Sequence, residues 1–292
     1  MNNLENIGLP EIICDQRFGV AENPLWHDRH QCLYWTDIPA GRVYRCNPKS
    51  CAVEQVYEGP VVGGFTIQAD DSLLLFLAGG AIAQWNEGRL ITVIDGLAAE
   101  RESRFNDVIA DPKGRVFCGT MPTNDLPGRL YILETNGRIS KLLDGVQCSN
   151  GMAFSGDLKY LLHTDSYART IHRFHYSESE GTIGARQVFC KVAEGDGYPD
   201  GLIRDASGDF WSARWGGGCI VRYSTTGSEI GRVNLPAKHV TSMAFGGSGL
   251  TELFVTTASQ ADPAELSAES GAIFRMSTSI QGMPEFRSRV RV

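Results

Sequence analysis

A turn signal recurs along the chain at nearly constant spacing, and this repeat constrains the fold more than any other feature of the sequence. Each signal is a short run, usually rich in Asp, Gly or Ser, that stands shortly before an apolar segment. The signals begin at Asp28, Asp70, Asp111, Ser155, Asp205 and Gly246, which are 42, 41, 44, 50 and 41 residues apart. A period of about 40 to 50 residues, with several short strands in each unit, is typical of a β-propeller.

The segments between the signals have the composition of β-hairpins. Residues 32–37 are followed by a Gly-containing turn and a second run at 42–45, and residues 210–213 are followed in the same way by 219–223. Glycine supplies the positive φ angles at which strands reverse, and helical periodicity is weak throughout. We therefore expect an all-β protein, a single six-bladed β-propeller over residues 1–292 with four antiparallel strands in each blade. A pair of β-sandwiches is the alternative, but the period continues through the middle of the chain without a linker.

Polar residues in several of these units are predicted to meet at one mouth of the central channel. The innermost strand of every blade lines the channel, so residues at its mouth come from different blades and lie about one period apart. Glu22, Asn106, Asn150 and Asp200 are separated by 84, 44 and 50 residues, which corresponds to two blades, one blade and one blade. Each local motif is also an ordinary turn sequence, so this prediction depends on the combined spacing.

The side chains of Glu22, Asn150 and Asp200 predict a site for one divalent cation. Two carboxylates and an amide carbonyl are hard oxygen ligands that leave positions open for water and substrate. They leave the identity of the ion open among Ca, Mn, Zn, Mg and Fe. Such a cation polarises a carbonyl group and lowers the pKa of bound water, and Asp200 is placed to act as a general base. Arg104 and Asn106 have the chemistry to hold a polyhydroxylated substrate.

Composition argues against several other classes of function. The net charge of −7 disfavours a nucleic-acid partner, because a phosphate backbone needs a basic face. The longest apolar run, residues 72–78, is far shorter than the roughly 20 residues that span a bilayer and is expected to be a buried strand. Residues 1–10 lack the features of a secretory signal, so we expect a cytoplasmic protein that is monomeric by default. The eight cysteines form no CxxC pair, which favours free buried thiols over disulfides or a zinc site.

The most specific motifs of the chain are residues 104–107 (RFND), 111–115 (DPKGR), 119–121 (GTM), 150–151 (NG), 163–166 (HTDS) and 198–201 (YPDG). Taken together, these motifs resemble those of the regucalcin/gluconolactonase family of sugar lactonases, from about Gly19 to the C-terminus. The resemblance implies a six-bladed propeller with one divalent metal in the channel. The positions that match the family's functional residues are Glu22, Asn150 and Asp200 for the metal, Arg104 and Asn106 for the substrate, Asp200 for the general base, and Asp107 and Asp165 for structural support.

Asn124 marks a departure from the family pattern. It follows the Gly-Thr-Met motif at a position where the resemblance leads us to expect a glutamate that binds the sugar. We predict that Asn124 contacts the substrate, and the departure leaves the substrate preference open. Trp215 and Cys148 lie close to the predicted site residues in sequence, but we expect both side chains to belong to the core.

The predicted function is metal-dependent hydrolysis of a sugar lactone, an aldonolactone, to the aldonic acid. Two alternatives stay open from the sequence. One is a promiscuous esterase or organophosphate hydrolase, for which we find no second acidic cluster that would bind a structural calcium. The other is a calcium-binding propeller without catalytic activity, since a fold does not by itself imply a function.

Overall fold

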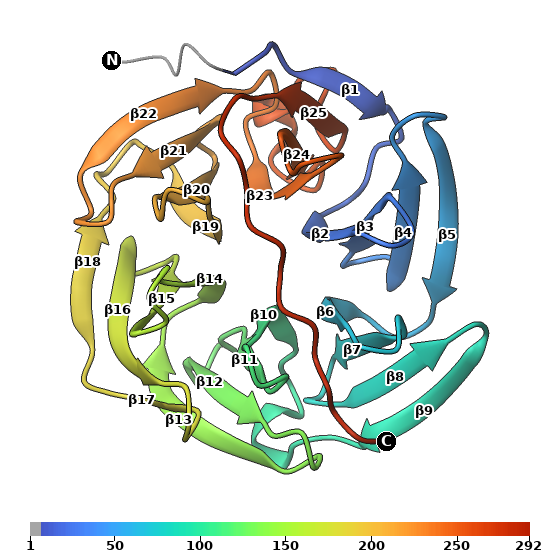
Figure 1. The fold of residues 1–292 in the computed structure, drawn as a ribbon, viewed down its shortest axis with the longest axis vertical. Helices are drawn as coiled ribbons and strands as arrows, with labels where there is room; N and C mark the ends of the chain where they lie inside the picture. The colour runs from blue at the N-terminus through green and yellow to red at the C-terminus, as the bar shows by residue number, and fades with distance from the viewer. Residues whose placement is uncertain (1–6) are drawn as a thin grey trace.

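A computed structural model describes residues 7–292, which form a ring of six antiparallel sheets around a central channel (Figure 1). The first six residues belong to the polar N-terminal stretch considered above and lie outside the described residues. The predicted all-β, six-bladed propeller is confirmed. Within residues 7–292 the structure has no helix long and apolar enough to cross a membrane.

Each sheet is one blade, and its strands are given below in order from the channel outward. Blade 1 contains β2 (Ala21–His27), β3 (Cys32–Asp37), β4 (Arg42–Asn47) and β5 (Ala52–Glu58). Blade 2 contains β6 (Val62–Ile67), β7 (Leu73–Leu77), β8 (Ile82–Asn86) and β9 (Arg89–Ile94). Blade 3 contains β10 (Phe105–Ala110), β11 (Val116–Thr120), β12 (Gly128–Leu133) and β13 (Ile139–Val146).

The second half of the ring follows the same order, with one addition and one exchange. Blade 4 contains β14 (Ser149–Phe154), β15 (Tyr160–Asp165) and β16 (Thr170–Ser177), and both β17 (Thr182–Ile183) and β18 (Gln187–Lys191) pair with β16. Blade 5 contains β19 (Tyr198–Arg204), β20 (Phe210–Trp215), β21 (Cys219–Tyr223) and β22 (Glu229–Asn234). Blade 6 contains β23 (Val240–Gly246), β24 (Glu252–Thr257), β25 (Ile273–Ser277) and, from the other end of the chain, β1 (Glu11–Cys14). Four strands per blade are therefore found in five blades, and blade 4 has five.

The turn signals join the innermost strand of each blade to the second strand. The Asp111 carboxylate accepts the backbone N–H groups of Lys113 (2.9 Å) and Arg115 (3.0 Å). Asp205 accepts the N–H of Ser207 (2.9 Å) in the same way. An aspartate that bonds to the backbone two residues ahead stabilises a tight turn, which explains why this residue type recurs with the period of the blades.

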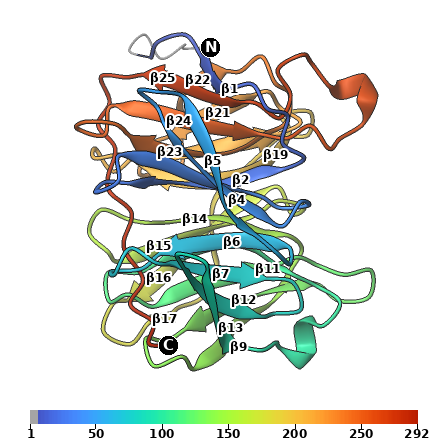
Figure 2. The ribbon, with the colours of Figure 1, turned by 90° about the vertical axis from the view of Figure 1, so that its right-hand side faces the viewer.

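The two ends of the chain complete the ring. β1 pairs with β25, so the outermost strand of blade 6 comes from the N-terminal part of the chain. Beyond β25, residues 278–292 cross the channel on one face of the ring (Figures 1 and 2), and we call this segment the C-terminal strap. Its backbone hydrogen bonds to other blades include Ala206 N–H to Gln281 O (2.8 Å), Ser288 N–H to Ile67 O (3.1 Å) and Arg289 N–H to Gly114 O (2.9 Å).

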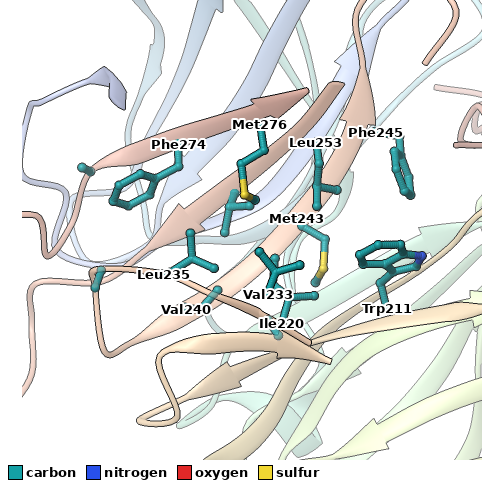
Figure 3. Close-up of a cluster of buried hydrophobic side chains, with 14 residues drawn as sticks. Trp211, Ile220, Val233, Leu235, Val240, Met243, Phe245, Leu253, Phe274 and Met276 are labelled. Atoms are coloured by element: carbon teal, nitrogen blue, oxygen red, sulfur yellow. The ribbon is translucent and has the colours of Figure 1, made fainter. Parts of the chain in front are cut away.

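Apolar side chains fill the spaces between neighbouring blades. Between blades 5 and 6, Trp211, Leu253 and Phe274 are fully buried in one such cluster (Figure 3). Burying a side chain of this size stabilises the fold by about 1.5–3 kcal/mol. The apolar run in β7 is buried at all five positions, as expected.

The eight cysteines are free thiols. Six are buried, Cys32 is half-buried and Cys51 is exposed, so the expectation of buried thiols was wrong for Cys51. Its backbone φ angle of 53° places it in a tight turn between β4 and β5, where its side chain has no core to enter.

Candidate functional site

The innermost strands of blades 1, 3, 4 and 5 bring the predicted residues together at the end of the channel away from the C-terminal strap. They line a cavity of about 300 Å³. Its polar lining includes Glu22, Arg104, Asn106, Asn150, Ser166 and Asp200, and its less polar lining includes Met121, Cys148, Tyr167, Tyr198 and Trp215. All of the predicted site residues except Asn124 are therefore in one place.

An irregularity in strand pairing occurs at each of these positions. The register of the innermost strand against the second strand shifts between Glu22 and Leu25, Phe105 and Val108, Ser149 and Met152, and Pro199 and Leu202. A β-bulge bends a strand and re-aims a side chain, and bulges are common beside functional sites. Asn106, Asn150 and Asp200 are the first residues inside these irregularities, and Glu22 directly precedes one.

Two glycines allow the innermost strands of blades 4, 5 and 6 to approach closely. A Cβ atom at Gly151 would lie 2.1 Å from the backbone nitrogen of Leu202, and one at Gly201 would lie 2.2 Å from Ser242 Oγ. Contacts this short are not possible, so both positions need glycine. Because Gly151 and Gly201 directly follow Asn150 and Asp200, the close approach brings these two side chains toward a common point.

Glu22 and Asp200 are buried carboxylates, 7% and 5% exposed, and neither forms an ion pair with another residue in the described part of the chain. Burial, with the charge of Glu22 adding to it, raises the pKa of Asp200 well above its usual range. Burial also raises the pKa of Glu22 to about 8, with a further contribution from the Asp107 charge. Glu22 Oε2 accepts the N–H of Asn23 at 2.6 Å, whereas no described residue donates a hydrogen bond to the Asp200 side chain. The cavity therefore holds more negative charge than its surroundings compensate.

The donor set fits a divalent cation. Asn150 Nδ2 donates to Ser166 Oγ at 3.0 Å, so the amide oxygen of Asn150 points away from Ser166 and receives no hydrogen bond from the described residues. Two carboxylates and one amide carbonyl match the oxygen ligands that hard divalent cations prefer. Burial and, to a lesser extent, the neighbouring carboxylates raise the pKa of both carboxyl groups, and a bound cation would favour their charged forms.

Arg104 and Asn106 form a connected pair. Arg104 Nη1 donates to Asn106 Oδ1 at 2.6 Å and to the carbonyl of Phe105 at 2.9 Å. Asn106 Nδ2 donates to the carbonyl of Ser149 at 2.8 Å. Both ends of the Asn106 amide are thus engaged within the protein, so Asn106 orients Arg104 while the other guanidinium N–H groups are available to the cavity. Burial lowers the pKa of Arg104, but an arginine keeps its charge at neutral pH.

The structure does not bring Asn124 to the cavity. Asn124 is exposed and does not belong to the cavity lining. The N–H of Thr123 bonds to the Leu126 carbonyl at 2.8 Å, and Thr123 Oγ1 accepts the Leu126 N–H at 3.0 Å. These bonds close a tight turn with Asn124 at its exposed tip, a geometry that the family motif alone does not reveal.

Of the two supporting aspartates, Asp165 has a backbone role. It is buried and its carboxylate accepts the N–H groups of Gln147 (3.1 Å) and Cys148 (3.0 Å). Asp107 lies one residue beyond Asn106 on β10, and burial raises its pKa to about 7. It adds to the negative charge that Glu22 and Asp200 experience.

Two residues expected in the core line the cavity instead. Cys148 lies directly before β14, and its side chain is buried but lines the cavity, so the expectation that it points away from the site was wrong. Trp215 ends β20 directly opposite Tyr198, the first residue of β19. Its position at the end of a strand next to the Asp200 motif is the signal that places it at the cavity.

Two tyrosines at the rim were not anticipated. Tyr167 is 55% exposed and Tyr198 is 37% exposed, and their ring centroids lie 6.1 Å apart in an edge-to-face arrangement. The Arg169 guanidinium lies 4.1 Å from the centre of the Tyr198 ring and donates to the Gly197 carbonyl at 2.6 Å. Tyr198 is the first residue of the 198–201 motif and Tyr167 directly follows the 163–166 motif, and these positions could have identified them.

A second group of possible metal ligands lies at the other end of the channel. The ligand atoms of His27, His30 and Asp71 are within 4.8 Å of one another. However, His27 Nδ1 accepts the His30 N–H at 3.1 Å, so the proton of the neutral ring is on Nε2, 3.3 Å from Asp71 Oδ1. Arg29 and Arg287 also pair with Asp71. This group therefore fits an anchor for the C-terminal strap better than a cation site.

The chain matches a known protein family and resembles several characterised proteins. Residues 20–259 match the SMP-30/Gluconolactonase/LRE-like region. The chain is 42% identical to pentonolactonase XacC of Haloferax volcanii, over 96% of this chain and 98% of that protein. It is 32% identical to 6-deoxy-6-sulfogluconolactonase of Pseudomonas putida, over 91% of this chain and 94% of that protein. A solved luciferin-regenerating enzyme superposes with a TM-score of 0.89 at 25% identity, over 97% of this chain and 100% of that chain.

Proposed function

Because the chain belongs to the SMP-30/gluconolactonase/LRE-like family, we propose that it is a lactonase that hydrolyses a sugar lactone to the aldonic acid. The observation that carries this proposal is the convergence of Glu22, Asn150, Asp200 and Arg104 on one cavity of about 300 Å³. A cavity of this size, with a few convergent polar groups, is typical of a small-molecule site.

Five-carbon aldonolactones are the substrates that we propose first. The pentonolactonase is 42% identical to this chain, compared with 32% for the sulfogluconolactonase, and both are aligned over more than nine-tenths of this chain. Among the residues that the structure describes, Arg104 is the one cationic side chain in the cavity lining, and it is already bonded to Asn106. An uncharged sugar lactone therefore suits the cavity better than one that carries a sulfonate or phosphate.

Glu22, Asn150 and Asp200 are the side chains that would hold a divalent cation. When bound, such a cation polarises a lactone carbonyl and makes water more acidic. The remaining lining groups would orient the substrate: Arg104 by hydrogen bonds to sugar hydroxyls, and the faces of Tyr167 and Tyr198 by contact with the apolar edge of the ring.

Asp200 is the group that we propose as general base. Its carboxylate lines the cavity and accepts no hydrogen bond from the described residues, so it is free to accept a proton from a water molecule as that water attacks the lactone carbonyl carbon. As the bond from the carbonyl carbon to the ring oxygen breaks, the same proton passes from Asp200 to that oxygen, which leaves as a hydroxyl group. The carboxylic acid product then ionises to solvent. Arg104 is placed to offset negative charge on the carbonyl oxygen during attack.

The test is acid release from a panel of five- and six-carbon aldonolactones. The protein is stripped of metal with a chelator and resupplied with one divalent ion at a time, and the rate is compared with spontaneous hydrolysis. We expect one or more ions to restore turnover, with a higher kcat/KM for five-carbon lactones. Asp200→Asn is expected to lower kcat by at least about 100-fold, whereas Asp157→Asn, at an exposed turn, leaves it unchanged.

The outcomes separate the alternatives. Turnover of simple esters or organophosphates but not of lactones would favour the esterase reaction class. Tight cation binding without hydrolysis of any lactone would favour a calcium-binding propeller. Full activity in Asp200→Asn would contradict the general-base role while leaving the lactonase proposal intact.

A further inference from the structure

Three hydrogen bonds between neighbouring blades end on a backbone carbonyl that directly precedes a proposed cation ligand. The donor–acceptor pairs are Thr241 Oγ1 to the Ala21 carbonyl (2.6 Å), Asn106 Nδ2 to the Ser149 carbonyl (2.8 Å) and Ser166 Oγ to the Pro199 carbonyl (2.6 Å). The residues that follow these carbonyls are Glu22, Asn150 and Asp200. In each case the donor belongs to the blade before the one that carries the ligand.

We propose that Thr241 and Ser166 are positioning residues for the cation, an inference that rests on the cation site proposed above. A carbonyl group and the Cα atom of the next residue share one rigid peptide plane. A bond that fixes the Ala21 carbonyl therefore fixes where the Glu22 side chain begins, and the bond to the Pro199 carbonyl does the same for Asp200. Ligands held in this way keep their separation when the cation is absent, so less conformational entropy is lost when the cation binds.

Ser166 positions two ligands with one hydroxyl group. Its single proton is donated to the Pro199 carbonyl, so its oxygen must accept the hydrogen bond from Asn150 Nδ2. This direction fixes the Asn150 amide, because exchanging its oxygen and nitrogen would place two acceptors against each other. The Asn150 carbonyl oxygen is thereby presented to the cavity, at a set distance from the strand that carries Asp200.

Thr241 gives blade 6 a role in the cavity, although none of the described residues of that blade lines it. It is fully buried and lies in the register shift of β23 between Val240 and Ser242. This is the position in its blade that Asn150 and Asp200 occupy in theirs. In blade 6 the re-aimed side chain holds the neighbouring backbone instead of contributing a ligand.

Thr36 provides a matched control within the same protein. It is fully buried, and its Oγ1 lies 3.1 Å from the Val62 carbonyl of the next blade and 3.0 Å from the Arg42 carbonyl. The residue after Val62 is Gly63, which has no side chain and does not line the cavity. The Thr36 hydroxyl has one proton to share between these two carbonyls, so its removal takes away a buried polar contact between blades without releasing a ligand.

The experiment compares the full-length wild type with Thr241→Val, Ser166→Ala and Thr36→Val, each stripped of metal. Calorimetric titration with the Ca²⁺, Mn²⁺ or Zn²⁺ ion alone gives the Kd, and urea unfolding in chelator gives the structural effect. We expect the urea midpoints of Thr241→Val and Thr36→Val to fall by similar amounts. The Kd is expected to rise at least about 10-fold in Thr241→Val and Ser166→Ala and to stay within about twofold of wild type in Thr36→Val.

Thr241→Ser keeps the hydroxyl and is expected to restore the wild-type Kd, which separates the hydrogen bond from simple packing. The inference is overturned if Thr241→Val and Ser166→Ala bind the ion as Thr36→Val does. If wild type binds none of the ions, the proposed cation site fails together with this inference, whereas unaltered variants beside a binding wild type overturn the inference alone.

Discussion

Replacing Glu22 with Gln tests whether the buried charge of Glu22 destabilises the folded protein when no cation is present. Gln has nearly the same shape as Glu, and its side-chain oxygen can still accept the Asn23 N–H bond seen at 2.6 Å. The substitution therefore removes a buried charge with little change in packing. We expect the metal-free Glu22→Gln protein to be more stable than metal-free wild type, even though it binds the cation less tightly.

The magnitude follows from the pKa of Glu22, which burial raises from 4.5 to about 8. A carboxyl group whose pKa is raised by folding holds a proton that the unfolded chain releases, so its contribution to stability is complete below pH 4.5 and is lost as the pH rises toward 8. One pKa unit corresponds to about 1.4 kcal/mol. Glu22 is therefore expected to lower the free energy of unfolding of the metal-free protein by about 1 kcal/mol at pH 5 and by about 4 kcal/mol at pH 8. Because the cavity is open to water, we expect about half of this, about 2 kcal/mol, to be measured at pH 8.

Urea unfolding in chelator at pH 5 and pH 8 measures this difference, with Glu180→Gln, at an exposed turn, as the control. A cation at 100 times its Kd stabilises the wild type by about 2.7 kcal/mol, so adding it at pH 8 is expected to reverse the order of stability. The reasoning is refuted if metal-free Glu22→Gln is no more stable than wild type at pH 8, or if its advantage is the same at both pH values.

Four further outcomes follow from the packing and the cavity. Gly151→Ala is expected to lower the free energy of unfolding by about 2 kcal/mol and to weaken cation binding, because the new Cβ would lie 2.1 Å from the Leu202 nitrogen; unchanged urea midpoint and Kd would contradict this. Tyr198→Ala is expected to raise KM several-fold with little change in kcat, since the ring lines the rim of the cavity. A large fall in kcat in steady-state kinetics would contradict this and indicate that the tyrosine takes part in the chemical step. Val290→Ala in the C-terminal strap, where the side chain is 5% exposed, is expected to cost about 1–2 kcal/mol of stability while KM stays constant. Thiol titration after unfolding without reductant is expected to detect all eight cysteines, and a lower count would reveal a disulfide.

The fold was predictable because a turn signal recurs at the same position in every blade. The turn signals mark the join between the first and second strands, and an aspartate such as Asp111 stabilises that turn through backbone hydrogen bonds. The exchange of strands between the ends of the chain was not predictable in this way. The period counts units but does not reveal that β1 completes blade 6, because pairing between the two ends of the chain leaves no local pattern.

The site was predictable in part, for a similar reason. Glu22, Asn150 and Asp200 are spaced by whole blades, and the structure brings them together. Asn124 lies at an exposed tip because hydrogen bonds at Thr123 close its loop away from the cavity, which no residue spacing encodes.

The pairing of Trp215 with Tyr198 and the bonds between blades needed three-dimensional information. Trp215 and Tyr198 lie opposite each other only because β19 and β20 pair in the observed register. Thr241 lies 220 positions from its partner Ala21, a separation at which a lone threonine carries no recognisable signal.

The pairing of β1 with β25, which completes blade 6, affects when the protein can fold during its synthesis. Blade 6 needs β1, which is synthesised early, and β25, which is synthesised late, so the ring cannot close until nearly the whole chain has left the ribosome. Until then the innermost strand of blade 1 lacks its neighbour on one side, and Thr241 is not present to hold the backbone before Glu22. Contacts between such distant segments form slowly, and the waiting intermediate exposes strand edges that can aggregate. A chain that ends anywhere before its last blade is therefore expected to have no lactonase activity, because the ring that holds the cavity together is incomplete.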